Sequence, residues 1–255
     1  MNIDRPIAAE IPALRALWKE AFGDSDAFLG DFFSTAFSPN RSRRIEENGQ
    51  ILSALYWFDG SYSGGKLAYL YAVATARSAR GRGLCRALME DTHRHLASLG
   101  YVGTILVPAE PSLFGFYRRM GYADCTSVRE FTVSASDSPL SLRAIGKEEY
   151  RSLRRALLPP DSVLQEGENL DFWATQAGFF ATSDSVFTAW IREDELVCSE
   201  LLGNVDQAPH LVAALGCSHG RFRTVGSEKP FTLWYPLKDN LPPPTYFGLA
   251  FDGFE

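Results

Sequence analysis

The chain has 255 residues, a length that fits one large domain or two small ones, and 45% of them are hydrophobic, which is enough for a packed core. The formal net charge of −6 argues against nucleic acid as the main partner. The longest apolar run spans only residues 68–74, far short of the roughly 20 residues that cross a bilayer, so no membrane association is expected.

Cysteine and histidine spacing indicates neither a disulfide framework nor a metal site. The cysteines are scattered and form no CxxC pair, which is typical of reduced thiols; they are Cys85, Cys125, Cys198 and Cys217. His93 and His95 are two residues apart on a predicted helix, which favours surface positions over metal ligation. Residues 1–20 carry charges throughout and contain no apolar signal core. We therefore expect a soluble cytoplasmic protein without a bound metal.

Residues 1–134 show the periodicities of seven strands and four helices. Asn48-Gly49 lies between two extended runs and predicts a tight hairpin, because both residues accept positive φ. The predicted elements are a strand at 3–7, helices at 9–22 and 26–37, a hairpin whose second strand is 50–58, a loop at 59–65, a strand at 66–75, a helix at 84–99, a strand at 101–107, a helix at 112–121, and a strand pair at 122–125 and 130–134. This order predicts an α/β fold, a mixed sheet with helices on both faces.

The polar segment 134–140 is rich in small residues and predicts a linker, so we divide the chain into domains at 1–136 and 137–255. The second domain is predicted to contain a strand at 142–146, helices at 147–159 and 168–180, a hairpin at 185–203 that turns at Glu193-Asp194, a helix at 208–217, and strands at 220–226, 231–237 and 245–252. This order echoes the first domain without a residue-level repeat. The second domain is therefore either a smaller, degenerate copy of the first or an unrelated α+β domain.

An arginine-glycine turn joins the predicted strand at 66–75 to the predicted helix at 84–99. Residues 76–119 contain seven arginines against three acidic residues, which reverses the negative charge of the chain locally. Backbone N–H groups at the start of a helix are unpaired and carry partial positive charge. Gly81 and Gly83 would let a ligand approach that backbone closely. The turn therefore predicts a pyrophosphate site, with a solvated arginine-rich helix face as the alternative.

Two other phosphate-binding loops do not fit this turn. A P-loop requires GxxxxGK[ST], and no lysine follows these glycines. A dinucleotide fingerprint requires a third glycine where the chain has Arg86, and no acidic residue ends a following strand at the right distance.

The stretch AVATARSARGRGLCRAL, residues 72–88, resembles the acetyl-coenzyme A signature of the GNAT acyltransferases, Q/R-x-x-G-x-G/A. Residues 80–85 match this signature except at the last place, where Cys85 stands for glycine or alanine. FYRRMGY, residues 116–122, resembles the last helix and following strand of that family. The resemblance covers about the first half of the chain and implies a GNAT fold there. The second half is then either a degenerate GNAT-like copy or an unrelated α+β domain.

The resemblance implies acetyl-CoA as the cofactor. The backbone of residues 73–75 would pair with the pantetheine arm like an added strand. Backbone N–H groups of residues 82–86 would hold the pyrophosphate, helped by neighbouring arginine side chains. The implied cofactor-binding residues are Val73, Ala74, Thr75, Arg80, Gly81, Arg82, Gly83, Leu84, Cys85 and Arg86.

Two catalytic candidates follow from the same resemblance. Tyr117 matches the family tyrosine that donates a proton or a hydrogen bond to the departing thiolate; its alternative is a core aromatic on an apolar helix face. Glu110 is the candidate general base, with a surface or capping role, or an ordered water in its place, as alternatives. Five aromatic residues on elements that border the acceptor side in this family belong either to the core or to the acceptor pocket: Phe28, Phe32, Phe33, Trp57 and Tyr62.

These residues imply an acetyl-CoA-dependent N-acetyltransferase. A primary amine of a small molecule or a peptide would attack the thioester directly. The alternative is a non-catalytic acyl-CoA-binding or sensing module, because Cys85 departs from the signature and the two central predicted strands contain no carboxylate. The second domain would cover the acceptor side or build an interface, and the oligomeric state stays open, a homodimer included.

Overall fold

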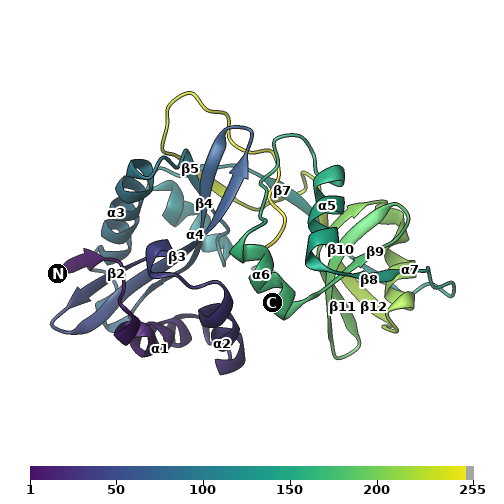
Figure 1. Ribbon diagram of the computed structural model, residues 1–255, viewed down its shortest axis with the longest axis horizontal. Helices are drawn as coiled ribbons and strands as arrows, with labels where there is room; N and C mark the ends of the chain where they lie inside the picture. The colour runs from purple at the N-terminus through teal and green to yellow at the C-terminus, as the bar shows by residue number, and fades with distance from the viewer. Residues whose placement is uncertain (251–255) are drawn as a thin grey trace.

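The computed structural model describes residues 1–250, which form two seven-stranded mixed sheets that lie side by side (Figure 1). The first sheet has the strand order β1-β2-β3-β4-β5-β14-β6. Its strands are β1 (Asn2–Asp4), β2 (Ser42–Glu47), β3 (Gln50–Tyr62), β4 (Gly65–Thr75), β5 (Gly103–Leu106), β6 (Ala123–Asp124) and β14 (Leu233–Pro236). The predicted α/β class, with a mixed sheet between helices, is confirmed.

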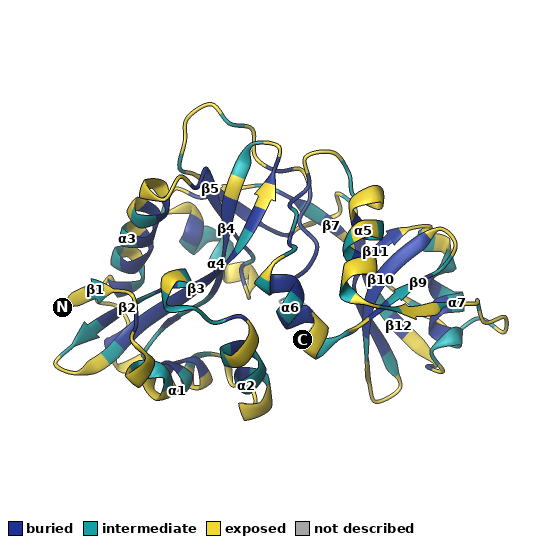
Figure 2. Ribbon diagram, in the orientation of Figure 1, coloured by how far each residue is buried: buried dark blue, intermediate teal, exposed yellow. Residues whose placement is uncertain are grey.

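The first sheet separates two layers of helices because its central strands are apolar on both faces. On β3, Tyr56 and Phe58 pack beneath α1 (Ile11–Phe22) and α2 (Asp26–Thr35). The alternate residues Leu55 and Trp57 pack on the opposite face, beneath two other helices, α3 (Leu84–Ser98) and α4 (Pro111–Arg118). Figure 2 shows β3 and β4 as the most continuously buried part of this sheet.

The second sheet has the strand order β13-β7-β12-β11-β10-β9-β8. Its strands are β7 (Ser127–Ser134), β8 (Arg143–Ile145), β9 (Gly178–Ala181), β10 (Ser185–Arg192), β11 (Glu195–Gly203), β12 (His219–Val225) and β13 (Lys229–Pro230). Its helices are α5 (Lys147–Leu157), α6 (Glu168–Gln176) and α7 (Ala208–Ala214). The helix α6 lies between the sheets, where the ring of Phe172 is 5.2 Å from that of Phe28 and 5.5 Å from that of Phe32.

The two sheets exchange strands across the predicted linker. The predicted pairing of the strands near 122–125 and 130–134 is wrong: β6 pairs with β14 in the first sheet, and β7 pairs with β12 and β13 in the second. The late strand β14 also pairs with β5, so it inserts between β5 and β6. Apolar side chains on β14 complete the first sheet's core, which explains why it leaves its sequence neighbours. A domain boundary at residue 136 stays a prediction.

Most predicted elements match the structure within a few residues, including the hairpin at Asn48-Gly49, where both residues have positive φ and Glu47 pairs with Gln50. Three expectations are wrong. The loop at 59–65 begins as a continuation of β3, and the end of the helix predicted at 168–180 is the strand β9. The strand predicted at 245–252 is irregular up to residue 250, and its last two residues lie outside the described part.

The C-terminal segment 245–250 returns to the first sheet, as the yellow end of the chain shows in Figure 1. The side chain of Gln165 bonds both backbone groups of Leu249, donating to its carbonyl at 2.7 Å and accepting from its N–H at 3.2 Å. The ring of Phe247 lies 4.7 Å from that of Tyr69 on β4. The second half of the chain therefore covers the α1–α2 side of β4.

Every helix among residues 1–250 is too short or too polar to span a bilayer.

The predicted surface position of His93 is wrong, because the ring is buried between α3 and the first sheet. It stacks on Tyr235 of β14 at 4.1 Å, and its Nε2 lies 2.9 Å from the hydroxyl of Tyr122. Burial lowers the pKa of His93 from the ordinary 6.5 to about 4.

The lowered pKa of His93 predicts a loss of stability in mild acid. Between pH 6.5 and 4, His93 is protonated in the unfolded chain and neutral in the folded chain. Its contribution to the free energy of unfolding is therefore complete above pH 6.5 and falls as the pH decreases. The decrease amounts to about 3 kcal/mol for this group. Denaturant unfolding of His93→Gln across this range should show a shallower pH dependence than the parent. Equal slopes would contradict the lowered pKa.

Candidate active site

The site lies where β4 and β5 separate. The two strands pair in parallel from Leu67 with Gly103 to Tyr69 with Ile105, and no further register pair follows. Just beyond this point β4 carries one extra residue relative to β3, a β-bulge between Tyr71 and Ala74. Ala72 at the bulge has φ 48°, a left-handed backbone that is uncommon for a residue with a side chain. The bulge turns β4 away from β5 and opens the sheet.

The arginine-glycine turn lies at the open end of this gap. Gly81 and Gly83 both adopt left-handed backbone, with φ of 77° and 76°. A Cβ at either position would meet only open space, so the backbone angle, and not crowding, requires glycine. Gly83 is the N-cap of α3 and provides no side-chain cap. The first N–H groups of α3 are therefore left for another acceptor.

A cavity of about 610 Å³ brings the predicted residues together. It lies between the end of β4, the glycine turn and α4, with Ala21 and Phe22 of α1 at its edge. The predicted site residues that line it are Val73, Ala74, Thr75, Arg80, Gly81, Gly83, Leu84, Cys85, Arg86, Glu110 and Tyr117. Arg82 is not among the lining residues, and its guanidinium instead forms an ion pair with Glu47 of β2 at 2.8 Å.

The two arginines of the cavity are held by carbonyl groups. Arg80 Nε donates to the carbonyl of Thr75 at 3.3 Å, and Arg86 donates to the carbonyl of Arg119 at 3.0 Å. A carbonyl does not neutralise a guanidinium, so both keep their charge for an anion at the turn. The nearest acid to Arg86 is Glu90, one helical turn on, at 4.0 Å.

Tyr117 and Cys85 face the cavity from neighbouring helices. Tyr117 is 8% exposed, and its ring packs 5.3 Å from Phe116 and 5.9 Å from Tyr122. Burial raises the pKa of the Cys85 thiol to about 11, so the thiol is neutral at physiological pH. A small neutral side chain preserves close approach to the first turn of α3.

Glu110 occupies the N-cap position of α4 at the rim of the cavity. Its backbone carbonyl accepts from Leu113 N–H at 3.0 Å, and its carboxylate accepts from the Ser112 hydroxyl at 3.2 Å. The side chain itself does not cap the helix. Its carboxylate is exposed and open to water.

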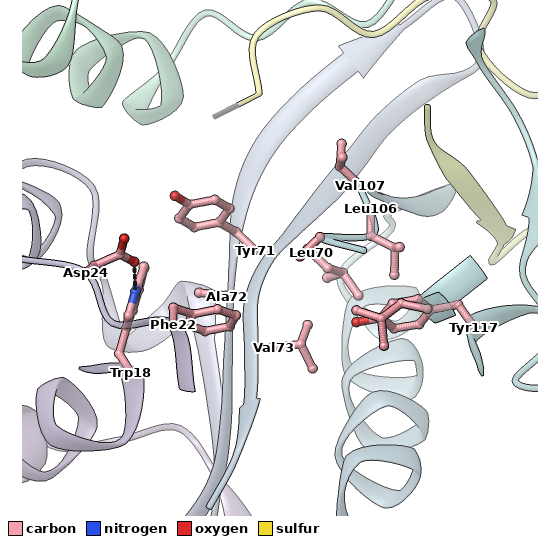
Figure 3. Close-up of a pocket in the computed structure, with 12 residues that line it drawn as sticks. Trp18, Phe22, Asp24, Leu70, Tyr71, Ala72, Val73, Leu106, Val107 and Tyr117 are labelled. Carbon is pink, nitrogen blue, oxygen red and sulfur yellow. Dashed lines mark hydrogen bonds between the residues drawn. The ribbon is translucent and has the colours of Figure 1, made fainter. Parts of the chain in front are cut away.

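A second cavity of about 80 Å³, shown in Figure 3, shares part of its lining with the first and reaches Trp18 of α1. Phe22, Val73, Ala109, Leu113 and Tyr117 line both cavities. The smaller one also includes Trp18, Asp24, Leu70, Tyr71, Ala72, Leu106 and Val107. The five aromatic residues expected near the acceptor side do not line either cavity and pack in or against the core.

The sequence analysis did not identify Asp24 as a site residue. Asp24 and Ser25 both precede α2, and both residue types can cap a helix. Ser25 is the cap, since its hydroxyl accepts from the Phe28 N–H at 3.1 Å. Asp24 instead turns toward the small cavity, where its Oδ2 accepts from Trp18 Nε1 at 2.7 Å. The sequence does contain a signal for this role. Asp24 directly follows Gly23, which ends α1, and α2 already has Ser25 as its cap, so Asp24 is free for another role.

A comparison with known protein families assigns the first half of the chain to the acyltransferases. Residues 2–125 match the family model of the acetyltransferase (GNAT) domain, so this first half of the chain is a GNAT domain. No curated protein matches the chain.

Solved structures share the fold over nearly the whole chain. The GCN5-related N-acetyltransferase of Anabaena variabilis is 13% identical, with a TM-score of 0.71 over 93% of this chain and 73% of that one. The GCN5-related N-acetyltransferase of Kribbella flavida is 14% identical, with a TM-score of 0.69 over 92% and 72%. A conserved protein of unknown function from Enterococcus faecalis is 15% identical, with a TM-score of 0.70 over 93% and 72%. At these identities the likeness concerns the fold.

Replacing Gly83 with alanine should destabilise the protein by about 1–2 kcal/mol, because alanine resists left-handed backbone. Gly146 provides a matched control, since it is also an uncapped N-cap glycine in open space but has φ −80°. Denaturant unfolding of Gly83→Ala and Gly146→Ala measures the difference. Equal losses in the free energy of unfolding of the two variants would mean that the left-handed backbone at residue 83 does not disfavour alanine.

Proposed function

We propose that the protein transfers the acetyl group of acetyl-CoA to a primary amine by direct attack of the amine. The observation that carries this proposal is the shared cavity, where the end of β4, the glycine turn and Tyr117 meet. A neutral ligand would not need a helix start and two arginines, and an anion without a leaving group would not need a buried phenol at the same opening. A cytoplasmic location belongs to the same proposal.

The residues present fit coenzyme A. Unpaired N–H groups at the start of α3, together with Arg80 and Arg86, would hold the diphosphate. The backbone of residues 73–75 lies along the same cavity, where it would pair with the pantetheine amides like an added strand. Neutral Cys85 leaves room beside the diphosphate. Acetyl-CoA would supply the activated thioester.

The residues around Tyr117 would then carry the transfer. Attack by the neutral amine forms the new C–N bond, and the C–S bond breaks as the thiolate leaves. The phenol of Tyr117 would give its proton to that sulfur. A backbone N–H at the bulge near Val73 would stabilise the oxyanion, because the extra residue of a bulge is left without a ladder partner.

The acceptor amine must lose one proton before or during attack. Glu110 lines the exposed rim of the large cavity and does not line the small one. Because it would not contact an amine in the small cavity, Glu110 would receive the proton through water. The C-terminal half would cover the acceptor side, because Phe247 already packs on Tyr69 of β4.

Calorimetry with coenzyme A tests the cofactor site. Association is expected for the parent protein and should weaken at least about tenfold in Gly83→Glu, because a carboxylate would repel the diphosphate and strain the turn. Gly146→Glu should bind like the parent, because Gly146 has an ordinary backbone angle and lines neither cavity. No association with the parent protein would refute the proposed function.

Thiol release from acetyl-CoA with a panel of amines tests the chemistry. Tyr117→Phe should lower kcat by about a hundredfold, the range of a lost general acid, and leave the affinity for coenzyme A unchanged. Tyr122→Phe is the matched control, because its ring neighbours Tyr117 but does not line either cavity. Cofactor binding without turnover of any amine would favour the non-catalytic binding module instead.

A further inference from the structure

The two joined cavities carry opposite charge. Arg80 and Arg86 line the large cavity with Glu110 at its exposed rim, so the charged lining is net positive where an anionic diphosphate is proposed to bind. Among the described residues that line the small cavity, Asp24 alone is charged. The remaining lining is mostly aliphatic and aromatic. A single carboxylate in such a lining creates a local preference for a cation.

The protein does not neutralise Asp24 itself. Within residues 1–250, no ion pair is formed by Asp24, and the nearby basic side chains are directed elsewhere. Lys19 pairs with Asp26 at 2.8 Å, and Arg77 donates to the backbone carbonyl of Glu20 at 3.2 Å. Asp24 is half-buried, so its charge is less screened than that of an open surface acid.

The carboxylate of Asp24 is held in one orientation. Trp18 is 2% exposed and is fixed in the aromatic core between α1 and β4, with Tyr56 at 5.1 Å and Tyr71 at 5.6 Å. Its indole N–H donates to one carboxylate oxygen of Asp24 at 2.7 Å. The other oxygen has no partner among the described residues. A rigid donor on one oxygen therefore leaves the second for a ligand.

The walls around this carboxylate suit an organic cation. Trp18, Phe22 and Tyr71 all line the cavity beside Asp24. Aromatic faces attract ammonium groups, and the attraction is strongest where water is excluded. An ammonium group would gain both a charge-assisted hydrogen bond and contact with these rings.

Asp24 and Tyr117 lie at opposite ends of the small cavity, with Ala72 and Val73 between them (Figure 3). A carboxylate beside the reacting nitrogen would hold it as an ammonium ion, which cannot attack a thioester. Because Asp24 and Tyr117 lie apart, one nitrogen of an acceptor can stay protonated at Asp24 while another nitrogen reacts near Tyr117.

We propose that Asp24 selects acceptors that carry a second cationic group in addition to the primary amine that is acetylated. This inference rests on the proposed acetyl transfer and names the substrate class of the same site. The acceptor class is a diamine or a longer polyamine, with the spacing between its nitrogens set by the cavity. Asp24 acts in specificity and takes no part in bond making.

The test compares diaminoalkanes with monoalkylamines of the same chain length, using thiol release from acetyl-CoA. The parent protein should prefer the diamine in kcat/KM by about tenfold or more. In Asp24→Asn this preference should fall about tenfold, mainly through KM, because asparagine still accepts from Trp18 but carries no charge. Taking the ratio of the two acceptors within each variant cancels their different intrinsic reactivities.

Asp26→Asn is the matched control, because it removes an exposed acid two residues away that pairs with Lys19, and it should keep the parent ratio. A parent protein without preference for diamines overturns this inference and leaves the acetyl transfer intact. An equal loss for both acceptors in Asp24→Asn also overturns it and leaves Asp24 a structural role. Absence of turnover with every amine would instead refute the proposed function and this inference with it.

Discussion

The extra residue in β4 is the constraint on which the rest of the site depends. Without it, β4 and β5 would continue as a paired parallel ladder, and the sheet would be closed where the two cavities now lie. The bulge places Ala72 in left-handed backbone, at a cost of about 1–2 kcal/mol. Tyr71 and Ala74 on either side are buried in the core beneath α1, which holds the strained residue in place. The strained backbone of Ala72 and the separation of β4 from β5 therefore have the same origin, the bulge in β4.

The far wall of the opening depends on the second half of the chain. The strand β14 pairs along the whole of β5, and Trp234 lies so close to Gly103 that a Cβ there would come within 2.1 Å of its ring. Glycine at this point leaves room for the ring of Trp234 to lie against β5. Buried between β5 and β6, β14 cannot be removed without opening the first sheet. The two halves therefore share a sheet as well as an interface.

The two cavities that make up the opening differ in the charge of their lining as well as in size. The helix start and two arginines line the large cavity, with Glu110 at its rim, and the carboxylate of Asp24 lines the small one. Figure 3 shows Asp24 and Tyr117 on opposite sides of the small cavity. Tyr117, a neutral phenol, lies where the two cavities meet. Such an arrangement would guide an anionic thioester and a cationic acceptor to the same point from different sides.

The sequence by itself determined the local features: the hairpin at Asn48-Gly49, the glycine turn, the helix that follows it, and the stretch of chain that forms the cavity. Each depends on the backbone preferences of a few neighbouring residues, and these preferences can be read from a short stretch of sequence. Only the tertiary structure decided that β14 joins the first sheet, that His93 is buried, and that Asp24 lines a cavity. These outcomes depend on partners far away in the chain, such as Trp18 and Tyr235, because burial and strand pairing are set by the packing of the whole molecule.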